Sequence, residues 1–275
     1  MIILKKFLFV SDLDGTLLNK KHDLSRSTIR NIRKLVKKGH YVVPNTGRPY
    51  QGTIKFIDKL QIDCPFICDN GGSIYWHGHS DFPKFYQIDK DIAISFFKEI
   101  DEFVYSAMLA SHQKIYLKNS SKIPFWMKHQ NEETQLIEED YLNNIDTDIT
   151  NISIYILEED RNKMLEILDK YKDYIKYREW GSHLGLRSYE LYSVNSSKGN
   201  AMLYLKKYLG IEDGCVLGFG DNLNDIELLE KADVPVSMKN SRSELHKYSK
   251  YITKHTNRKN GVIKFIKKYL KQRGC

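Results

Sequence analysis

Two carboxylates stand close together near the start of the chain. In FLFVSDLDGTLL (7–18), Asp12 and Asp14 are two residues apart and follow a short apolar run over 7–10 that is typical of a buried strand. Paired carboxylates in a crevice can hold a divalent metal ion or move a proton. An Asp-Gly turn whose side chains only bind backbone amides also explains an isolated pair. An EF-hand does not, because Leu17 stands where that loop requires glycine.

A second acidic cluster lies in GFGDNLNDIELL (218–229), again after a predicted strand. If Asp221 opens a helix, Asn224 and Asp225 follow three and four residues later and share one helix face. The three side chains would then converge on one point. The alternative is that acids near a helix start only complement its dipole. A dinucleotide-binding loop is less well supported, since its third glycine is missing.

Two further positions could neutralise an anion. Thr46 follows the strand predicted over 41–43, and together with Gly47 it can present a hydroxyl and backbone amides. Lys198 begins the helix predicted over 197–209, where a lysine opposes the helix dipole by about 0.3 to 1 kcal/mol unless an anion binds there. A solvent-exposed lysine is the alternative interpretation.

The predicted elements place all of these residues at one edge of one sheet. A strand, a helix and a strand over 7–10, 25–38 and 41–43 imply parallel strands joined by a crossover helix. The next helix is expected over 54–60, and the parallel pattern resumes after 197. Between 85 and 188 aromatic and acidic residues become frequent, which indicates an inserted α+β module. The predicted fold is therefore α/β, a doubly wound parallel-sheet core with an inserted cap. The predicted domains are 1–84 with 189–275 for the core and 85–188 for the cap, and ligands are expected at the carboxyl ends of the strands.

Taken together, these side chains form a set suited to phosphoryl transfer. Carboxylates can hold Mg²⁺, and the metal, a threonine and a lysine can neutralise phosphoryl oxygens. A carboxylate that acts as nucleophile would form an aspartyl-phosphate. The sequence has no GxSxG motif, so a serine nucleophile of that kind is not expected.

The composition favours anionic partners. The 275 residues include 43 lysines and arginines against 35 aspartates and glutamates, a formal net charge of +8. The lysines are scattered, and the dense stretch 264–273 is typical of the solvated face of a terminal amphipathic helix. We therefore expect a small phosphorylated metabolite as partner and no nucleic acid. The sequence predicts no particular oligomeric state.

The sequence also bears on membranes and cysteines. No apolar run approaches the roughly 20 residues that span a bilayer, and two lysines interrupt the N-terminal run, which therefore fails as a secretory signal. A cytoplasmic protein without a membrane partner is expected. The four cysteines have no paired spacing and are expected to be free thiols. Cys64 and Cys68, taken with the histidines downstream, match none of the common zinc patterns.

The motifs resemble those of the haloacid dehalogenase (HAD) superfamily, and within it the Cof-type phosphatases with a large αβ cap. VSDLDGTLL, NTGR, SSKGNAM and GFGDNLNDIELL resemble the first to fourth motifs of that family, in the same order. The resemblance includes ICDNGGSIY and the C-terminal NGVIKFIKKYL, so it covers both halves of the core, whereas the cap matches only in position and length. Asn45, Leu228 and Ser237 depart from the usual pattern, and these departures bear on specificity rather than activity.

The resemblance implies a role for each matching residue. Asp12 would be the nucleophile, and Asp14 would protonate the leaving oxygen and then activate water. Asp12, Asp221 and the Asp14 carbonyl would bind Mg²⁺, and Asp225 would hold the waters of the metal. The residues expected to contact the phosphoryl group are Thr46, Gly47, Lys198 and Asn224, with Arg48 as a further candidate.

The resulting functional expectation is a phosphoric monoester hydrolase. It would be a Mg²⁺-dependent phosphatase of small phosphorylated metabolites, with sugar phosphates as the expected class. A phosphomutase of similar fold and a non-catalytic phosphate-binding regulatory module are the alternatives. His183 and Arg187, near the turns expected at Gly181 and Gly185 of the cap, are candidates for contacting the leaving group. Arg48 or Asn70 could serve instead on the core side.

Overall fold

The chain divides into two compact units. A computed structural model describes residues 5–112, 114–122 and 135–274. The first unit takes in the residues up to 49, 53–84 and those from 197 on, and the second takes in 50–52 and 85–196. The domain boundary predicted after residue 188 lies inside the strand β11 (Leu186–Ser193). The whole of this strand belongs to the second unit.

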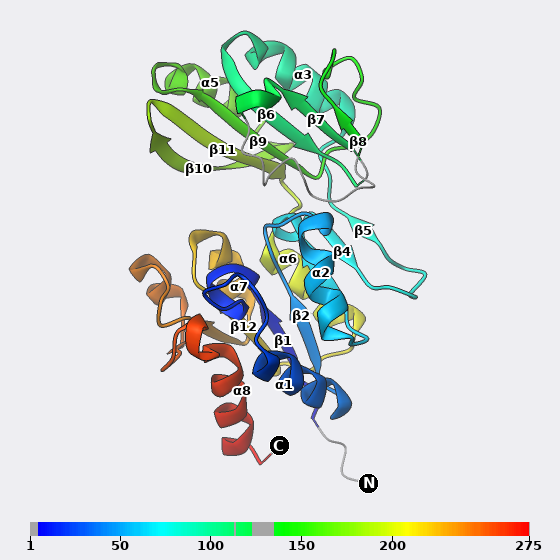
Figure 1. Cartoon of the computed structure of the whole chain (residues 1–275), viewed down its shortest axis with the longest axis vertical. Coiled ribbons are helices and arrows are strands. Elements are labelled where there is room, and N and C mark those ends of the chain that lie inside the picture. The colour runs from blue at the N-terminus through cyan, green and yellow to red at the C-terminus, as the bar shows by residue number, and fades with distance from the viewer. Residues whose placement is uncertain (1–4, 113, 123–134, 275) are drawn as a thin grey trace. The chain divides into compact units, whose positions relative to one another are not determined.

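A five-stranded parallel sheet forms the centre of the first unit (Figure 1). Its order is β14-β13-β12-β1-β2, and every neighbouring pair is parallel. Strands that are buried on both faces are rich in apolar residues, and β1 and β12 are buried along their whole length. The bounds are β1 (Leu8–Ser11), β2 (Tyr41–Pro44), β12 (Val216–Gly220), β13 (Val234–Ser237) and β14 (Tyr251–Ile252).

Helices connect these strands, as crossover connections require. The sequence places their starts through capping residues: the Ser25 hydroxyl accepts a hydrogen bond from Thr28 N at 3.0 Å, and the Ser197 hydroxyl accepts one from Asn200 N at 2.9 Å. The second cap sets Lys198 as the first residue of its helix. The bounds are α1 (Arg26–Lys37), α2 (Tyr50–Leu60), α6 (Lys198–Tyr208), α7 (Ile226–Lys231) and α8 (Gly261–Gln272).

A short second sheet follows β2 along the chain. It has the order β3-β4-β5, with β3 (Phe66–Cys68) antiparallel to β4 (Ser73–Tyr75), and β5 (Lys84–Phe85) as the third strand. Cys64, Cys68 and Cys215 are buried free thiols, and Cys275 lies outside the described residues. Within the described ranges, no helix combines the length and the apolar composition that a membrane-spanning segment needs.

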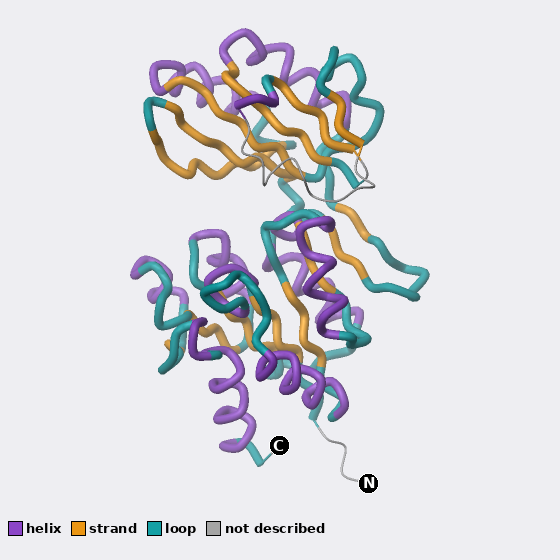
Figure 2. Tube along the Cα trace, in the orientation of Figure 1, coloured by secondary structure: helices purple, strands orange, loops and turns teal. Residues whose placement is uncertain are grey.

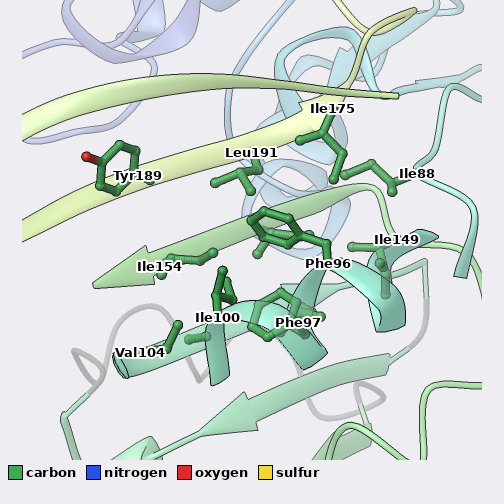
Figure 3. Packing of buried hydrophobic residues seen from close by; sticks show 14 of the residues in the cluster. Ile88, Phe96, Phe97, Ile100, Val104, Ile149, Ile154, Ile175, Tyr189 and Leu191 are labelled. Atoms are coloured by element: carbon green, nitrogen blue, oxygen red, sulfur yellow. The ribbon is translucent and has the colours of Figure 1, made fainter. Parts of the chain in front are cut away.

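The second unit is a six-stranded sheet with helices packed on one face (Figure 2). Phe96 and Phe97 from one helix pack with Ile154 and Leu191 from the strands in a single buried cluster (Figure 3). The strand order is β10-β11-β9-β6-β7-β8. The bounds are β6 (Val104–Ala110), β7 (Lys114–Lys118), β8 (Gln135–Ile137), β9 (Asn151–Leu157), β10 (Ile175–His183), α3 (Lys90–Ile100) and α5 (Arg161–Lys170).

Two local predictions need correction. The helix expected over 54–60 begins at Tyr50, directly after Pro49, because the chain turns into the helix at that proline. Gly181 does not form a turn: it lies inside β10 at a register shift next to Glu179, where a glycine accommodates the bulge. Gly185, with φ of +77°, does lie at the hairpin tip.

Candidate functional site

The first strand ends in a sharp turn that carries Asp12. Asp12 directly follows β1, and the chain then turns through Gly15, whose φ is +77°. A Cβ atom at this position would lie 2.1 Å from Oδ2 of Asp221, so only glycine fits both the backbone conformation and the close approach. The side chain of Asn240 donates to the Gly15 carbonyl at 2.8 Å. The turn therefore brings the Asp12 loop directly against Asp221.

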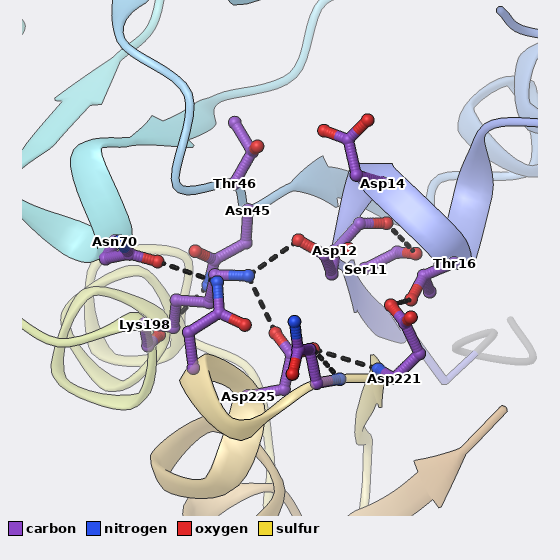
Figure 4. Close-up of polar contacts among 12 residues, drawn as sticks. Ser11, Asp12, Asp14, Thr16, Asn45, Thr46, Asn70, Lys198, Asp221 and Asp225 are labelled. Atoms are coloured by element: carbon purple, nitrogen blue, oxygen red, sulfur yellow. Dashed lines mark hydrogen bonds and ion pairs between the residues drawn. The ribbon is translucent and has the colours of Figure 1, made fainter. Parts of the chain in front are cut away.

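Lys198 lies fully buried between two carboxylates. Its Nζ donates to Oδ1 of Asp12 at 2.6 Å and to Oδ1 of Asp225 at 2.7 Å (Figure 4), and its side chain is 0% exposed. Burial alone would lower the pKa of this ammonium, but the two carboxylates raise it above its ordinary value. The lysine is therefore charged, and the alternative of a solvent-exposed residue is wrong.

Three carboxylates form one buried cluster. Asp12, Asp221 and Asp225 each offer an oxygen, and these atoms lie within 4.8 Å of one another. Burial raises the pKa of Asp12 well above its usual range, with Lys198 opposing this effect. Burial likewise raises the pKa of Asp221 to about 6, against the hydrogen bond from Thr16. One lysine among three acids leaves negative charge uncompensated, which fits a divalent cation with oxygen ligands.

The fourth motif is built differently from the prediction. Asp221 does not open the helix; Asn222 caps a single turn over Leu223–Asp225, which leads into α7. Oδ2 of Asp225 accepts hydrogen bonds from the backbone N of Asp221 at 2.9 Å and of Asn222 at 3.1 Å, while its Oδ1 binds Lys198. Asp225 thus holds this loop and the lysine in place, and Asp12 and Asp221 keep an oxygen without a protein donor among the described residues.

Thr46 and Gly47 lie at the end of β2, as expected. Thr46 is buried; its backbone N donates to Ile67 O at 3.0 Å, and its hydroxyl accepts a hydrogen bond from Arg48 N at 3.1 Å. A Cβ at Gly47 would lie 3.0 Å from the side-chain amide of Asn70. At Gly47 the loop therefore leaves a bare backbone beside the Asn70 side chain.

Asp14 is held by Arg48 and not by the acidic cluster. Nε and Nη2 of Arg48 donate to the two oxygens of Asp14 at 2.6 and 2.7 Å. Burial alone would raise the pKa of Asp14, but the hydrogen bonds and charge of Arg48, with a smaller effect of His22, lower it below the ordinary value. In Figure 4 the Asp14 carboxylate points away from the contact between Asp12 and Lys198.

Three further residues position this site. Sequence reasoning missed Thr16, noted Asn45 only as a departure from the family pattern, and named Asn70 only as a candidate for substrate contact on the core side. The Thr16 hydroxyl donates to Oδ1 of Asp221 at 2.7 Å. The side chain of Asn45, which is 0% exposed, donates to the Lys198 carbonyl at 3.0 Å. Asn70 is buried, has a left-handed backbone with φ of +53°, and accepts a hydrogen bond from Nδ2 of Asn224 at 3.0 Å. The Asp-Asn-Gly-Gly sequence after β3 was the available signal for Asn70.

The close approach of two loops explains the first glycine of that sequence. Gly71 has φ of +97°, and a Cβ there would lie 2.2 Å from the Ser197 carbonyl. The residue before Lys198 is therefore pressed against the loop that carries Asn70. The lysine and the asparagine are fixed relative to one another by backbone contact.

The two residues proposed for the cap have different surroundings. Arg187 donates from Nε to Glu158 at 2.9 Å and also pairs with Glu179, and its side chain is 16% exposed. It is part of an ion-pair group of the second unit. His183 is exposed beside the hairpin tip.

A doubly wound sheet whose strand ends gather these acids around one buried lysine defines an enzyme of the phosphoryl-transfer class. The chain belongs to the family of haloacid dehalogenase-like hydrolases, whose family model matches residues 9–266. A 5-amino-6-(5-phospho-D-ribitylamino)uracil phosphatase of Bacillus subtilis (strain 168) is 25% identical over 268 residues, which cover 96% of this chain and 98% of that protein.

Solved structures share this fold. A Thermotoga maritima protein is 26% identical, with a TM-score of 0.80 over 96% of this chain and 97% of that one. A HAD subclass IIB sugar phosphatase is 19% identical, with a TM-score of 0.72 over 96% and 98% of the two chains, and it shows the fold alone. The predicted family and fold class are confirmed, and the predicted enzyme class is supported.

Proposed function

We propose that this protein is a Mg²⁺-dependent phosphatase that hydrolyses small phosphorylated metabolites through an aspartyl-phosphate on Asp12. One observation carries the proposal: the Asp12 carboxylate lies 2.6 Å from a fully buried Lys198 ammonium, inside a cluster of three acids. The hydrogen bond and the charge of Lys198 oppose the effect of burial on the pKa of Asp12 and so favour its ionised, nucleophilic form.

The first chemical step joins Asp12 to phosphorus. A bond forms between a carboxylate oxygen of Asp12 and the phosphorus atom, and the bond from phosphorus to the leaving oxygen breaks. Asp14 gives its proton to that oxygen. Thr46, Gly47, Asn224 and Lys198 contact the phosphoryl oxygens and offset their charge.

The second step releases phosphate. Asp14, now ionised, takes a proton from a water molecule, whose oxygen attacks phosphorus, and the bond to Asp12 breaks. For both steps Asp14 must leave the Arg48 guanidinium that holds it at 2.6 and 2.7 Å. Arg48 is therefore proposed to set when Asp14 can act.

The acidic cluster is proposed to hold the metal. Asp12, Asp221 and the backbone carbonyl of Asp14 would bind Mg²⁺, and Asp225 would orient its waters. When bound, Mg²⁺ supplies positive charge to the phosphoryl oxygens. The all-oxygen donor set and the excess of negative charge support a hard divalent cation.

The proposed substrates are sugar phosphates and related polyol phosphates. Support comes from the names of relatives: one acts, by name, on a phosphoribitylamino compound, and one structural relative is a sugar phosphatase. The second unit is proposed to be the cap, residues 85–188 in the sequence-based division, that shields the reacting phosphoryl group from water. A cytoplasmic location is proposed with these substrates.

The test is release of inorganic phosphate from a panel of phosphorylated metabolites, with Mg²⁺ and with chelator. Metal-dependent release from sugar or polyol phosphates supports the proposal. Conversion of one sugar phosphate into an isomer without phosphate release would identify a phosphomutase. Binding of the panel without turnover would identify a regulatory module and contradict the proposal.

A further inference from the structure

Positive charge is concentrated in the last part of the chain. Residues 234–275 include 12 lysines and arginines and one acidic residue, Glu244. The net charge of the whole chain is only +8, so the remainder is slightly acidic. A charge asymmetry of this size within one domain is typical of a surface that meets a polyanion.

The structure gathers part of this charge around a hollow of about 660 Å³ between β14 and α8. Three aromatic rings line it: Tyr251 lies 5.6 Å from Phe265, and Phe265 stacks on Tyr269 at 6.1 Å between ring centroids. The Tyr269 hydroxyl is buried and has no hydrogen-bond partner within the described part of the chain. The cations that line the same hollow are Lys254, Lys264, Lys268 and Arg273.

Two more hollows continue this surface over α1, which contacts α8 (Figure 1). One of about 430 Å³ lies between the two helices, and one of about 580 Å³ lies along α1. No aspartate or glutamate among the described residues lines any of the three. The cations of the second and third hollows are Arg26, Arg30, Arg33, Lys34, Lys37, Lys38, Lys59, Lys267 and Lys271.

Most of these lysines have no carboxylate partner. Lys59 pairs with Asp23 at 2.7 Å. Across residues 5–112, 114–122 and 135–274, no ion pair involves Lys34, Lys37, Lys38, Lys254, Lys264, Lys267, Lys268 or Lys271. These positive charges also act on His255, because burial and four surrounding lysines lower its pKa. Unpaired like charges repel one another, and a polyanion would relieve this repulsion.

Shape and ring chemistry indicate which polyanion. A planar bilayer meets flat or convex surfaces, whereas these cations line concave hollows. Proteins that bind single-stranded nucleic acids combine a basic groove for phosphates with exposed aromatic rings for bases. Tyr251, which is 39% exposed at the edge of the sheet, offers such a ring beside Lys254 and Lys264.

We propose that the basic surface, formed by β14, α8 and α1, binds single-stranded nucleic acid, with phosphates on its lysines and a base stacked on Tyr251. None of the residues that line it belongs to the acidic cluster, so this site is separate from the proposed phosphatase site. The proposal departs from the sequence-based expectation of no nucleic-acid partner, because the lysines that are scattered in the sequence come together in the fold.

The first test measures binding of the full-length protein to a labelled, unstructured RNA of about 12 nucleotides by fluorescence anisotropy. Affinity should fall with salt, with a slope of about −0.7 for each phosphate contacted. The double variant Lys264→Gln/Lys268→Gln should reduce that slope by about 1.4. The control Lys98→Gln/Lys207→Gln removes the same charge from exposed positions elsewhere and should change nothing. Equal losses in both variants would overturn the proposal.

The second test separates base stacking from charge attraction. Tyr251→Ala should weaken RNA binding at least about 5-fold and leave binding of inorganic polyphosphate unchanged. Equal weakening of both ligands, or of neither, would overturn the stacking contact. Lysine-dependent binding to phosphatidylserine vesicles with no RNA binding would overturn the nucleic-acid assignment. Phosphate release from a small substrate by all variants verifies folding, since none of the substituted residues is in the proposed catalytic set.

Discussion

Arg48 and Asp14 form a bidentate ion pair, with donor–acceptor distances of 2.6 and 2.7 Å. Both residues follow strands of the central sheet, Asp14 after β1 and Arg48 after β2. The pair keeps Asp14 as a carboxylate, whereas the proposed first step needs it protonated. We therefore propose that Arg48 sets the protonation state of Asp14.

Replacing Arg48 should move the pH dependence of catalysis. Arg48 lowers the pKa of Asp14, so Arg48→Met should raise that pKa and enlarge the protonated fraction at neutral pH. The basic limb of the kcat/KM profile should then move to higher pH with a sugar phosphate, which has a poor leaving group. Nitrophenyl phosphate serves as the control, because its leaving group needs little protonation. If the basic limb of the kcat/KM profile moves with neither substrate, Asp14 is not the general acid.

Asp12→Asn should reduce turnover at least about a thousandfold. The amide is nearly isosteric but is a poor nucleophile, so circular dichroism and Tm should change little. Asp14→Asn is the matched partner. With nitrophenyl phosphate, whose leaving group needs little protonation, it should slow release of phosphate more than formation of the aspartyl-phosphate, and acid-quenched samples should contain protein with one added phosphoryl group. Retention of a substantial rate by Asp12→Asn would show that another residue is the nucleophile.

Removing Lys198 should destabilise the protein. Lys198→Met leaves Asp12 and Asp225 buried without their cation, and breaking a buried pair costs about 3 to 5 kcal/mol. Urea unfolding without metal measures this loss. The double variant Lys198→Met/Asp225→Asn should recover part of it, because one unpaired charge is gone. A loss below about 1 kcal/mol would mean that the contact contributes little in solution.

Stability without metal should depend on pH through Asp221. Its pKa is raised from 3.8 to about 6 in the folded protein, so the folded state binds more protons than the unfolded state over that interval. Stability should therefore fall as pH rises from about 4 to 6, by about 2 to 3 kcal/mol if Asp221 acts alone. Asp221→Asn should flatten this slope, which urea titrations at several pH values would detect. An unchanged slope in the variant would assign the effect to other groups.

Asn70 is predicted to position Asn224. Asn70→Gly tolerates the left-handed backbone and removes only the side chain that accepts the hydrogen bond from Asn224. Asn70→Ala removes the same side chain but adds about 1 to 2 kcal/mol of backbone strain. Both variants should lower kcat/KM similarly, roughly tenfold for a lost hydrogen bond to a substrate-binding group, whereas only Asn70→Ala should lower Tm clearly. Wild-type kinetics in Asn70→Gly would leave Asn70 with a purely structural role.

The sequence predicts the parts of this site that depend on local signals. Asp12 follows an apolar strand, and Ser197 caps the helix that begins with Lys198, so both placements can be derived from neighbouring residues. The contact between Lys198 and Asp12 joins residues 186 positions apart, and no local pattern fixes that distance. The same holds for Asn45 and Asn70, whose partners lie on α6 and in the loop before α7.

The basic surface could not be predicted from the sequence for the same reason. The lysines of α1 and α8 are far apart in the sequence and each set matches an ordinary solvated helix face. Only the packing of α1 against α8 makes them one surface. A distribution along the chain therefore says little about a distribution in space.

A short connection leads the chain from the second unit back to the first, and its end in the first unit is held by several contacts. β11 ends at Ser193, and Ser197 and Lys198 are fixed by the helix cap, by the Asn45 side chain and by the close approach of Gly71. Residues 194–196 are hydrogen-bonded as well: Val194 N donates to Tyr174 O at 3.1 Å, Asn195 N to the Ser193 hydroxyl at 3.4 Å and Ser196 N to Ser193 O at 2.8 Å. The chain therefore re-enters the first unit through a tethered segment, and the contacts that end this segment also fix the backbone of the lysine that binds Asp12.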